Sequence, residues 1–200
     1  MPFELNFGET IYEAGDVIEN VYFPDRGIIS LLATLGAESV LEIGIVCREG
    51  VVGLSSFLGA PKSRNRAIMQ GQGIAQMMKT FDFLAVCEKS PQLSQLLKHY
   101  AQSLMSQISQ SAVCYRFHKI DARLARWLLM TADCMVSDEF QLTHNFLSHM
   151  LGVRREAVSN AANDLQKRGI IQYSRGNIKI LERKALEGMS CPCYGILKNN

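Results

Sequence analysis

The segment from Gln141 to Leu181 constrains the fold most strongly, because its pattern predicts two helices joined by a tight turn and followed by a hairpin. Thr143 is placed to cap the first helix, and the apolar residues of that helix recur on one face. Gly152 follows, and glycine readily takes the left-handed conformation that a sharp turn between helices requires. A second helix is expected to start near Arg154. Ser174-Arg175-Gly176-Asn177 then separates two strand-like runs, so the segment predicts a helix-turn-helix with a wing.

The second helix separates a core face from a polar face. The side chains expected to face outward are Arg154, Arg155, Glu156, Ser159 and Asn160. Hydrogen-bonding side chains near the N-terminal end are what a helix needs to read base edges in the major groove. We predict that Arg155 contacts guanine, that Glu156 accepts a hydrogen bond from cytosine, and that Asn160 suits adenine. A helical hairpin used only for packing is the alternative.

Three further residues complete the predicted DNA-binding set. Thr143 stands at the start of the first helix, and Arg175 and Lys179 lie on the wing, where they would contact phosphates. Charge is distributed accordingly. Residues 1–115 contain 8 basic and 11 acidic residues (net −3), whereas residues 116–200 contain 13 and 8 (net +5). The basic excess therefore lies in the half that would neutralise phosphate.

The N-terminal half has a different pattern of apolar and turn-forming residues. From Glu9 to about Lys79, short runs rich in valine, isoleucine and leucine are separated by turn-forming residues, which is typical of an antiparallel barrel or jelly roll. The expected turns are Ala14–Asp16, Pro24–Gly27, Leu35–Ala37 and Gly71–Gly73. The predicted fold class is therefore α+β.

A long helix is expected between the two halves. It starts at Ser90-Pro91 and breaks near residues 117–120, after which Asp121 is placed to cap a helix over 122–135. Spacings of four and three relate Leu97, Ala101, Leu104, Ile108, Ser111 and Tyr115, as in the seam of a coiled coil. We expect a two-fold dimer interface here, with packing on the roll as the alternative. The predicted domains are residues 1–89 (roll), 90–120 (dimerisation helix and hinge) and 121–200 (winged helix-turn-helix).

Four stretches occur in an order shared with one known family: YEAGDVIENVYFPDRGIISL, ARLARWLL, LGVRREAVSNAANDLQKRGII and RGNIKIL. In this order the chain resembles the CRP/FNR superfamily of bacterial transcription regulators over almost its whole length. A branch that carries REGVVGLSSFLG and a terminal Cys-x-Cys-Tyr is more similar still. The resemblance implies a cyclic-nucleotide-binding-like roll and a homodimer that reads an inverted-repeat operator through the helix 154–168. It implies double-stranded DNA and a second copy of the chain as partners, with RNA polymerase as a candidate partner.

The effector site departs from the pattern of family members that bind cyclic AMP. Those members place a glutamate at the ribose hydroxyl and an arginine–serine pair at the cyclic phosphate. In the matching stretch Gly53 is followed by Leu54, and the later positions hold Arg64, Asn65 and Arg66. We therefore expect an effector other than cyclic AMP and assign no cofactor. Arg64 or Arg66 could bind an anion; a solvated turn charge is the favoured alternative.

The six cysteines show no zinc-finger spacing. Cys114 and His118 lie one helical turn apart and could chelate a metal, and Cys191 and Cys193 could share one. The sequence does not show that these four ligands converge, so we favour a structural or incidental role and assign no metal site. The first forty-six residues contain no cysteine, which argues against the N-terminal iron–sulfur cluster of one family member.

Other classes of protein find no support in the sequence. It has no GxSxG, HExxH or P-loop motif, so an enzyme is not expected. No apolar run is long enough to span a membrane, and the N-terminus is too acidic for a signal peptide, so a cytoplasmic location is expected. The family usually has a helical segment before its first strand, and the start of this chain fits a shortened form or a misplaced start. An adaptor that uses the winged helix for protein contacts is the alternative function.

Overall fold

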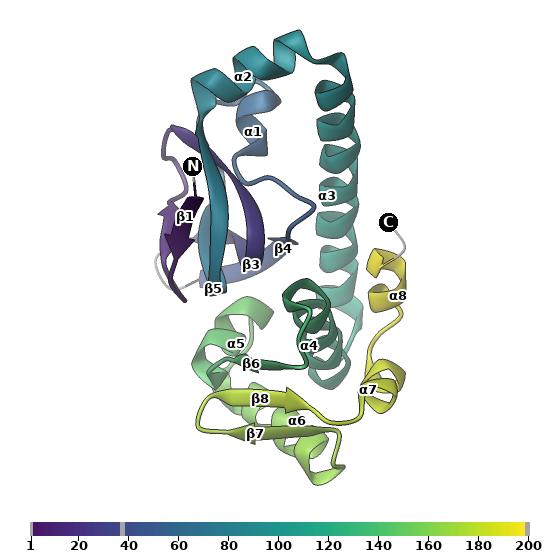
Figure 1. Cartoon of the computed structure of the whole chain (residues 1–200). Helices are drawn as coiled ribbons and strands as arrows, with labels where there is room; N and C mark the ends of the chain where they lie inside the picture. The colour runs from purple at the N-terminus through teal and green to yellow at the C-terminus, as the bar shows by residue number, and fades with distance from the viewer. Residues whose placement is uncertain (1, 37–38, 199–200) are drawn as a thin grey trace. The chain divides into compact units, whose positions relative to one another are not determined.

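The computed structural model describes residues 2–36 and 39–198, which divide into two compact units (Figure 1). The first comprises Met1–Thr34 and Ile43–Gln107, and the second comprises Leu35–Glu42 and Ile108–Asn200. The boundary falls inside the long helix α3 (Pro91–Phe117). The three-part division expected from the sequence stays a prediction. Among the described residues, no helix combines the length and apolar character that crossing a membrane requires.

The first unit is built on a curled five-stranded sheet (Figure 1). Its strands are β1 (Pro2–Leu5), β2 (Thr10–Tyr12), β3 (Asn20–Leu35), β4 (Ser39–Val46) and β5 (Arg66–Lys79). The sheet order is β1-β5-β3-β4, and β2 also pairs with β5. The helices α1 (Leu54–Phe57) and α2 (Thr80–Lys89) join the first part of α3 beside it. The expected antiparallel roll is confirmed.

Two of the expected turns are instead places where long strands bend. β3 runs through Pro24–Gly27 and β5 runs through Gly71–Gly73, with irregular register between the two strands. A Cβ atom on Gly27 would overlap the Met69 side chain, and one on Gly73 would overlap the Arg26 carbonyl. Glycine is present because the paired strands approach too closely for a side chain. The turn at Ala14–Asp16 is confirmed, whereas the one at Leu35–Ala37 lies partly outside the described residues.

The apolar seam of α3 packs within its own chain. Leu97 and Ala101 are only 5% and 8% exposed, and they belong to a core cluster with Phe83 and Val21. Leu104 packs against the same cluster and against the core of the roll. These three residues were expected at a dimer seam, but the roll already buries the side of α3 on which they lie. A helix with one apolar stripe buries it on the nearest apolar surface, and here that surface is intramolecular.

Helices surround a small sheet in the second unit (Figure 1). The helices are α4 (Ile120–Met135), α5 (His144–Leu151), α6 (Arg155–Lys167), α7 (Arg183–Met189) and α8 (Cys193–Lys198). The strands β6 (Glu139–Gln141), β7 (Ile171–Ser174) and β8 (Asn177–Ile180) lie in the order β6-β8-β7. The predicted winged helix-turn-helix and the α+β fold class are confirmed. Two details differ from the sequence-based prediction: Lys119, not Asp121, precedes α4 as its N-cap, and the helices α7 and α8 were not predicted.

Candidate nucleic-acid interface and cysteine–histidine cluster

The turn between α5 and α6 has the geometry that its sequence predicted. Thr143 Oγ1 accepts a hydrogen bond from the backbone N–H of Phe146 at 3.1 Å, which caps α5. Gly152 ends α5 in the left-handed conformation, with φ 59° and ψ 43°. Arg123 on α4 donates a hydrogen bond to the carbonyl oxygen of Leu151, the last residue of α5. This buried arginine therefore ties the turn to the core of the unit.

The helix α6 presents a polar face at its N-terminal end. Arg154, which precedes the helix as its N-cap, is exposed, as are Arg155, Glu156 and Asn160. The opposite face is buried through Val158, Ala161, Ala162 and Leu165. Asn163 is also exposed and lies three residues after Asn160 on the same side of the helix. Asn163 was not among the residues predicted from the sequence, although the spacing of four and three from Glu156 through Asn160 indicates it.

Ser159 differs from its neighbours because its hydroxyl already has a partner. Its Oγ lies 2.9 Å from Nδ1 of His144, at the start of α5. The His144 ring stacks on Tyr173 of β7, with centroids 4.2 Å apart and planes 11° from parallel. Burial, and then the positive charge of Arg155, lower the pKa of His144. Ser159 and His144 thus join α6, α5 and the wing into one surface.

The tip of the wing is a two-residue turn. Ser174 pairs with Asn177 across the hairpin, which leaves Arg175 and Gly176 between them. Their φ values of 49° and 84° are the two left-handed conformations of a type I′ turn. The Arg175 side chain is exposed, and holding a residue with a side chain in this conformation costs about 1 kcal/mol. A residue with better turn propensity would stabilise the hairpin, so the choice of arginine points to a use outside the fold.

Lys179 lies farther from the tip of the wing and has an acidic neighbour. It pairs in register with Glu139 of β6, and its Nζ lies 3.5 Å from a carboxylate oxygen of that residue. Both side chains are more than half exposed, so the ion pair is weak. Lys179 therefore presents less free positive charge than Arg175 does.

The residues predicted to bind an effector do not form a clamp for a cyclic phosphate in the first unit. Gly53 caps α1 in the left-handed conformation, and Leu54 is 6% exposed within the apolar core. Arg64 is exposed. Arg66 is committed elsewhere, with Nε 3.2 Å from Glu13 and with Nη2 donating to the hydroxyl of Thr10 at 2.8 Å.

A cavity of about 350 Å³ lies elsewhere in the roll. The lining residues are Ile11, Tyr12, Asp16, Val17, Ile18, Glu19, Asn20 and Tyr22, none of which the sequence analysis assigned to an effector. Burial raises the pKa of Tyr12, whose phenol also interacts with Ser63 and with the backbone of Gly53. Tyr12 therefore connects the cavity to Ser63 and Gly53.

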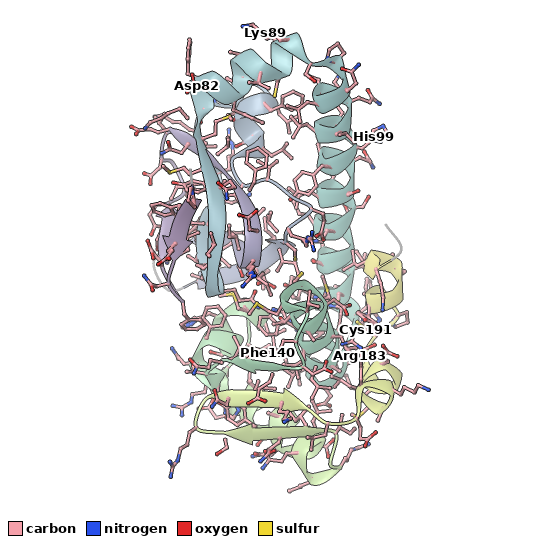
Figure 2. The ribbon with its side chains drawn as sticks, in the orientation of Figure 1. Asp82, Lys89, His99, Phe140, Arg183 and Cys191 are labelled. Atoms are coloured by element: carbon pink, nitrogen blue, oxygen red, sulfur yellow. The ribbon has the colours of Figure 1, made fainter. Side chains whose placement is uncertain are left out.

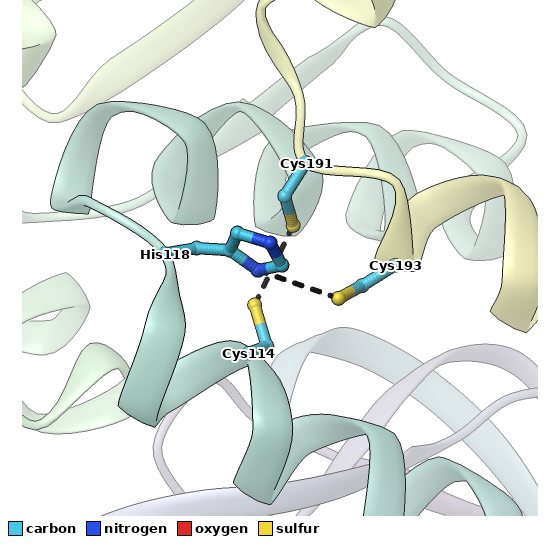
Figure 3. Close-up of side chains that lie close together, drawn as sticks. All are labelled: Cys114, His118, Cys191 and Cys193. Atoms are coloured by element: carbon cyan, nitrogen blue, oxygen red, sulfur yellow. Dashed lines mark hydrogen bonds between the residues drawn. The ribbon is translucent and has the colours of Figure 1, made fainter.

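A second constellation lies at the end of α3. Four side chains point toward one another there (Figure 3). Cys114 lies on α3 and His118 directly follows that helix, while Cys191 precedes α8 and Cys193 is its first residue. Their sulfur and nitrogen ligand atoms all lie within 4.8 Å of one another. The two sulfurs of Cys114 and Cys191 are 3.5 Å apart, as are Cys193 Sγ and His118 Nδ1. The three thiols are free and buried, so the structure supplies the convergence that the sequence alone did not show.

The surroundings of the paired thiols Cys114 and Cys191 shift their pKa values in opposite directions. The hydrogen bond between the Cys114 and Cys191 sulfurs lowers the pKa of Cys114, and the positive charge of Arg126 acts in the same direction. The same hydrogen bond, together with burial, raises the pKa of Cys191. The side-chain amide of Gln110 donates to Cys193 Sγ at 3.0 Å. Cys114 is therefore the thiol of this pair that loses its proton first.

Charged residues anchor the C-terminal segment that carries Cys191 and Cys193. Arg183 of α7 forms ion pairs with Asp133 and with Asp138, the latter at 3.1 Å. The Tyr194 hydroxyl donates to Asp133 at 2.8 Å. Figure 2 labels Arg183 and Cys191 where this segment passes α4. The network holds the segment in place independently of the cluster.

The chain was compared with protein-family models, with curated proteins and with solved structures. Residues 122–189 match the model of the Crp-like helix-turn-helix domain. A search of curated proteins finds no match for the sequence. The matched residues include the capped turn, α6 and the wing, and they exclude all four members of the cysteine–histidine cluster.

Solved structures share the fold of the whole chain. FixK2 from Bradyrhizobium japonicum is 19% identical with a TM-score of 0.81, over 96% of this chain and 97% of that chain. TTHB099, a CRP-family transcriptional regulator from Thermus thermophilus, is 19% identical with a TM-score of 0.79, over 95% and 96%. The c-di-GMP-responsive global regulator CLP from Xanthomonas campestris is 14% identical with a TM-score of 0.73, over 90% and 93%. The resemblance to CRP/FNR regulators is confirmed for the fold.

Proposed function

We propose that this chain, whose residues 122–189 belong to the Crp-like helix-turn-helix domain family, regulates transcription as a cytoplasmic homodimer bound to an inverted-repeat operator. The observation that carries the proposal is the exposed polar end of α6. A helix with a buried apolar face and free hydrogen-bonding side chains at its N-terminal end suits the major groove. The polymerase that transcribes the regulated gene is the expected protein partner.

Base recognition is assigned to the exposed side chains of α6. Arg155 would donate to guanine O6 and N7, and Glu156 would accept from cytosine N4. Asn160 and Asn163 follow along the same side and suit adenine. Arg154 and Arg175 would neutralise phosphates at either end of this surface, and the hydroxyl of Thr143 remains able to donate to a phosphate. Ser159 contributes through its bond to His144, and Lys179 contributes least because Glu139 is beside it.

Dimerisation is assigned to the exposed side of α3. Positions that repeat at steps of three and four along this side are exposed in the single chain; they are Gln95, Lys98, Gln102, Met105, Ser109, Ala112 and Arg116. This is the spacing of a coiled-coil seam, and small or uncharged residues occupy its middle. The face predicted from Leu97, Ala101 and Leu104 is already buried by the roll. Ile108 and Tyr115 belong to that same predicted stripe, and Tyr115 donates a hydrogen bond to the Glu42 carbonyl.

The effector is proposed to be a ligand other than cyclic AMP. An apolar, buried Leu54 offers no acceptor for a ribose hydroxyl, and Arg66 is paired with Glu13. An unpaired buried hydroxyl typically costs about 1–3 kcal/mol of binding free energy, which lowers affinity by roughly ten- to a hundredfold. Calorimetry with cyclic AMP tests this directly. Micromolar binding that also tightens operator binding would contradict the proposal.

Selection of bound sequences from random DNA by the purified protein tests the main proposal. An inverted repeat should emerge, and affinity for it should fall steeply as salt rises. Replacing Met105 and Ala112 with glutamate should give folded monomers in sedimentation and weaken operator binding. Failure to enrich any sequence, with binding indifferent to salt, would favour a role for the winged helix in protein contacts.

A further inference from the structure

We propose that Cys114, His118, Cys191 and Cys193 bind a single zinc ion. Three sulfur ligands and one imidazole are a donor set that proteins use for structural zinc, and soft thiolates disfavour magnesium and calcium. On binding, the three thiols release their protons to solvent, and the His118 ring binds as the neutral base through Nδ1. The inference is independent of DNA binding, because it rests on residues outside the matched domain.

The separations of the ligand atoms suit one ion. Zinc lies about 2.3 Å from sulfur and about 2.0 Å from nitrogen, so neighbouring ligands of a tetrahedral site lie roughly 3.5–3.8 Å apart. The Cys114–Cys191 sulfurs and the Cys193 Sγ–His118 Nδ1 pair, both at 3.5 Å, are near that value. All four ligand atoms lie within 4.8 Å of one another, so small rotations would complete the tetrahedron. An iron–sulfur cluster fits less well, because its ligands bind different irons and are spread farther apart.

The charges around the cluster suit a zinc–thiolate centre. Three thiolates, one neutral imidazole and a divalent ion carry one net negative charge. Arg126 is 3% exposed, its Nε lacks a hydrogen-bond partner, and it takes part in none of the salt bridges found among the described residues. Its guanidinium interacts electrostatically with Cys114. A buried arginine of this kind needs a negative counter-charge, and the metal centre would provide one.

Outer-sphere contacts orient two of the ligands. The Gln110 side chain donates to Cys193 Sγ at 3.0 Å, a contact that stabilises a thiolate and directs its lone pairs. The Cys191 backbone N–H donates to the Ala122 carbonyl at 3.4 Å, which fixes the entry of the C-terminal segment. Zinc sites commonly depend on such partners for part of their affinity.

The position of the site along the chain indicates its role. Cys114 and His118 precede the matched residues 122–189, whereas Cys191 and Cys193 follow them. Cys114 and Cys191 are 77 residues apart, so the ion would close a loop that contains the complete helix-turn-helix domain. Joining both ends of a domain lowers the conformational entropy of its unfolded state and stabilises the folded one. The metal would thus fasten the end of α3 to the C-terminal segment.

Zinc and cobalt binding to the full-length protein in reducing buffer provide the test. Wild-type protein should retain one zinc per chain after dialysis, measured by elemental mass spectrometry. Its Co²⁺ form should show thiolate-to-metal charge-transfer absorption. The double variant Cys191→Ser/Cys193→Ser should lose zinc affinity by more than the roughly 10- to 100-fold that loss of an outer-shell partner costs. Cys87→Ser is the matched control, since Cys87 is also a buried free thiol but lies in the first unit.

The wild-type protein alone can decide the proposal should a variant fail to fold. Zinc should protect Cys114, Cys191 and Cys193 from alkylation, and His118→Cys should retain the ion with stronger charge-transfer absorption. The proposal is overturned where wild-type protein in reducing buffer with equimolar zinc retains none after dialysis. It is also overturned where the double variant retains as much zinc as wild type. Equal formation of a Cys114–Cys191 disulfide under mild oxidant with and without zinc would assign the cluster to thiol chemistry instead.

Discussion

The exposed polar end of α6 and the cysteine–histidine cluster are encoded in opposite ways. Arg155, Glu156 and Asn160 follow one another on a single helix, and their exposure follows from the helical period alone. The four members of the cluster come in two pairs, and Cys114 lies 77 residues from Cys191. The polar end of α6 is therefore formed by residues that are close in the sequence. The cysteine–histidine cluster forms only after the second unit has folded.

The two sites also differ in how they depend on the fold. The polar end of α6 is exposed, and its side chains are free to contact DNA as soon as the helix forms. The cluster is mostly buried, and its ligands meet because the Arg183 network and the core of α4 position the C-terminal segment. We therefore expect changes at the cluster to alter stability, and changes on α6 to alter base choice.

The largest expected effect separates these two readouts. Removal of zinc by a strong chelator should lower the free energy of unfolding of the second unit by about 4 kcal/mol, relative to protein in free zinc at a thousandfold excess over Kd. At urea concentrations below the unfolding midpoint of the metal-free protein, the base preference in selected DNA should stay unchanged. None of the four proposed zinc ligands lies on α6. Urea unfolding and repeated selection measure the two quantities. A changed operator sequence in the metal-free protein would show that the cluster shapes the reading surface.

The Arg155→Ala variant should have the converse effect. Loss of a bidentate contact to guanine should cost about 1–3 kcal/mol on the preferred operator and relax base choice at one position in each half-site. Its unfolding midpoint and zinc content should match those of wild type, since Arg155 is exposed. Titrations on operator and on random DNA supply the comparison, with the exposed Lys184→Ala as control. Equal weakening on both DNAs would reduce Arg155 to a phosphate contact.

The Arg175→Gly variant should move stability and affinity in opposite directions. Glycine takes the left-handed conformation of the turn without strain, so unfolding should become less favourable by about 0.5–1 kcal/mol. DNA affinity should fall on all sequences alike, and the slope of log affinity against log salt should decrease by about 1. Denaturant melts measure the change in stability, and salt titrations measure the change in DNA affinity and in its salt slope. An unchanged salt slope would remove Arg175 from the interface.

The smallest effect is a dependence on pH. Because burial and Arg155 lower the pKa of His144 below its ordinary value of 6.5, the unfolded chain takes up this proton more readily than the folded one. The contribution of His144 to stability is therefore complete above pH 6.5 and is lost as the pH falls through the folded-state pKa. Urea melts between pH 5 and pH 8 should show a shallower decline for His144→Gln than for wild type. Identical profiles would mean that His144 does not titrate in this range.

Much of the fold was predictable because its signals are local. The cap at Thr143, the left-handed Gly152, the start of α3 at Pro91 and the wing turn at Arg175-Gly176 each depend on a few adjacent residues. Their conformations follow from backbone sterics and capping, whatever the rest of the chain does. The class of the second unit and the exposed polar end of α6 were predicted on this basis.

Predictions that depended on which other segment of the chain packs against a residue were less accurate. The spacing of Leu97, Ala101 and Leu104 showed an apolar stripe but not what covers it, and the roll covers it. Gly27 and Gly73 signalled an unusual backbone but not whether it was a turn or a bend between paired strands. In both cases the sequence pattern fitted two structures, and only contacts between distant residues distinguished them.

By itself, the sequence determined a winged helix-turn-helix whose second helix has a polar N-terminal end, together with a basic excess in that half. Helical period, capping and charge are properties of neighbouring residues. Only the tertiary structure decided that Cys114 and His118 meet Cys191 and Cys193. The four side chains come together because the chain after the wing packs back against the rest of the unit. The packing of α7 and α8 on α4 fixes the position of this C-terminal segment. A pattern of adjacent residues does not specify the spatial distance between two distant segments, so the cluster could be identified only in the folded unit.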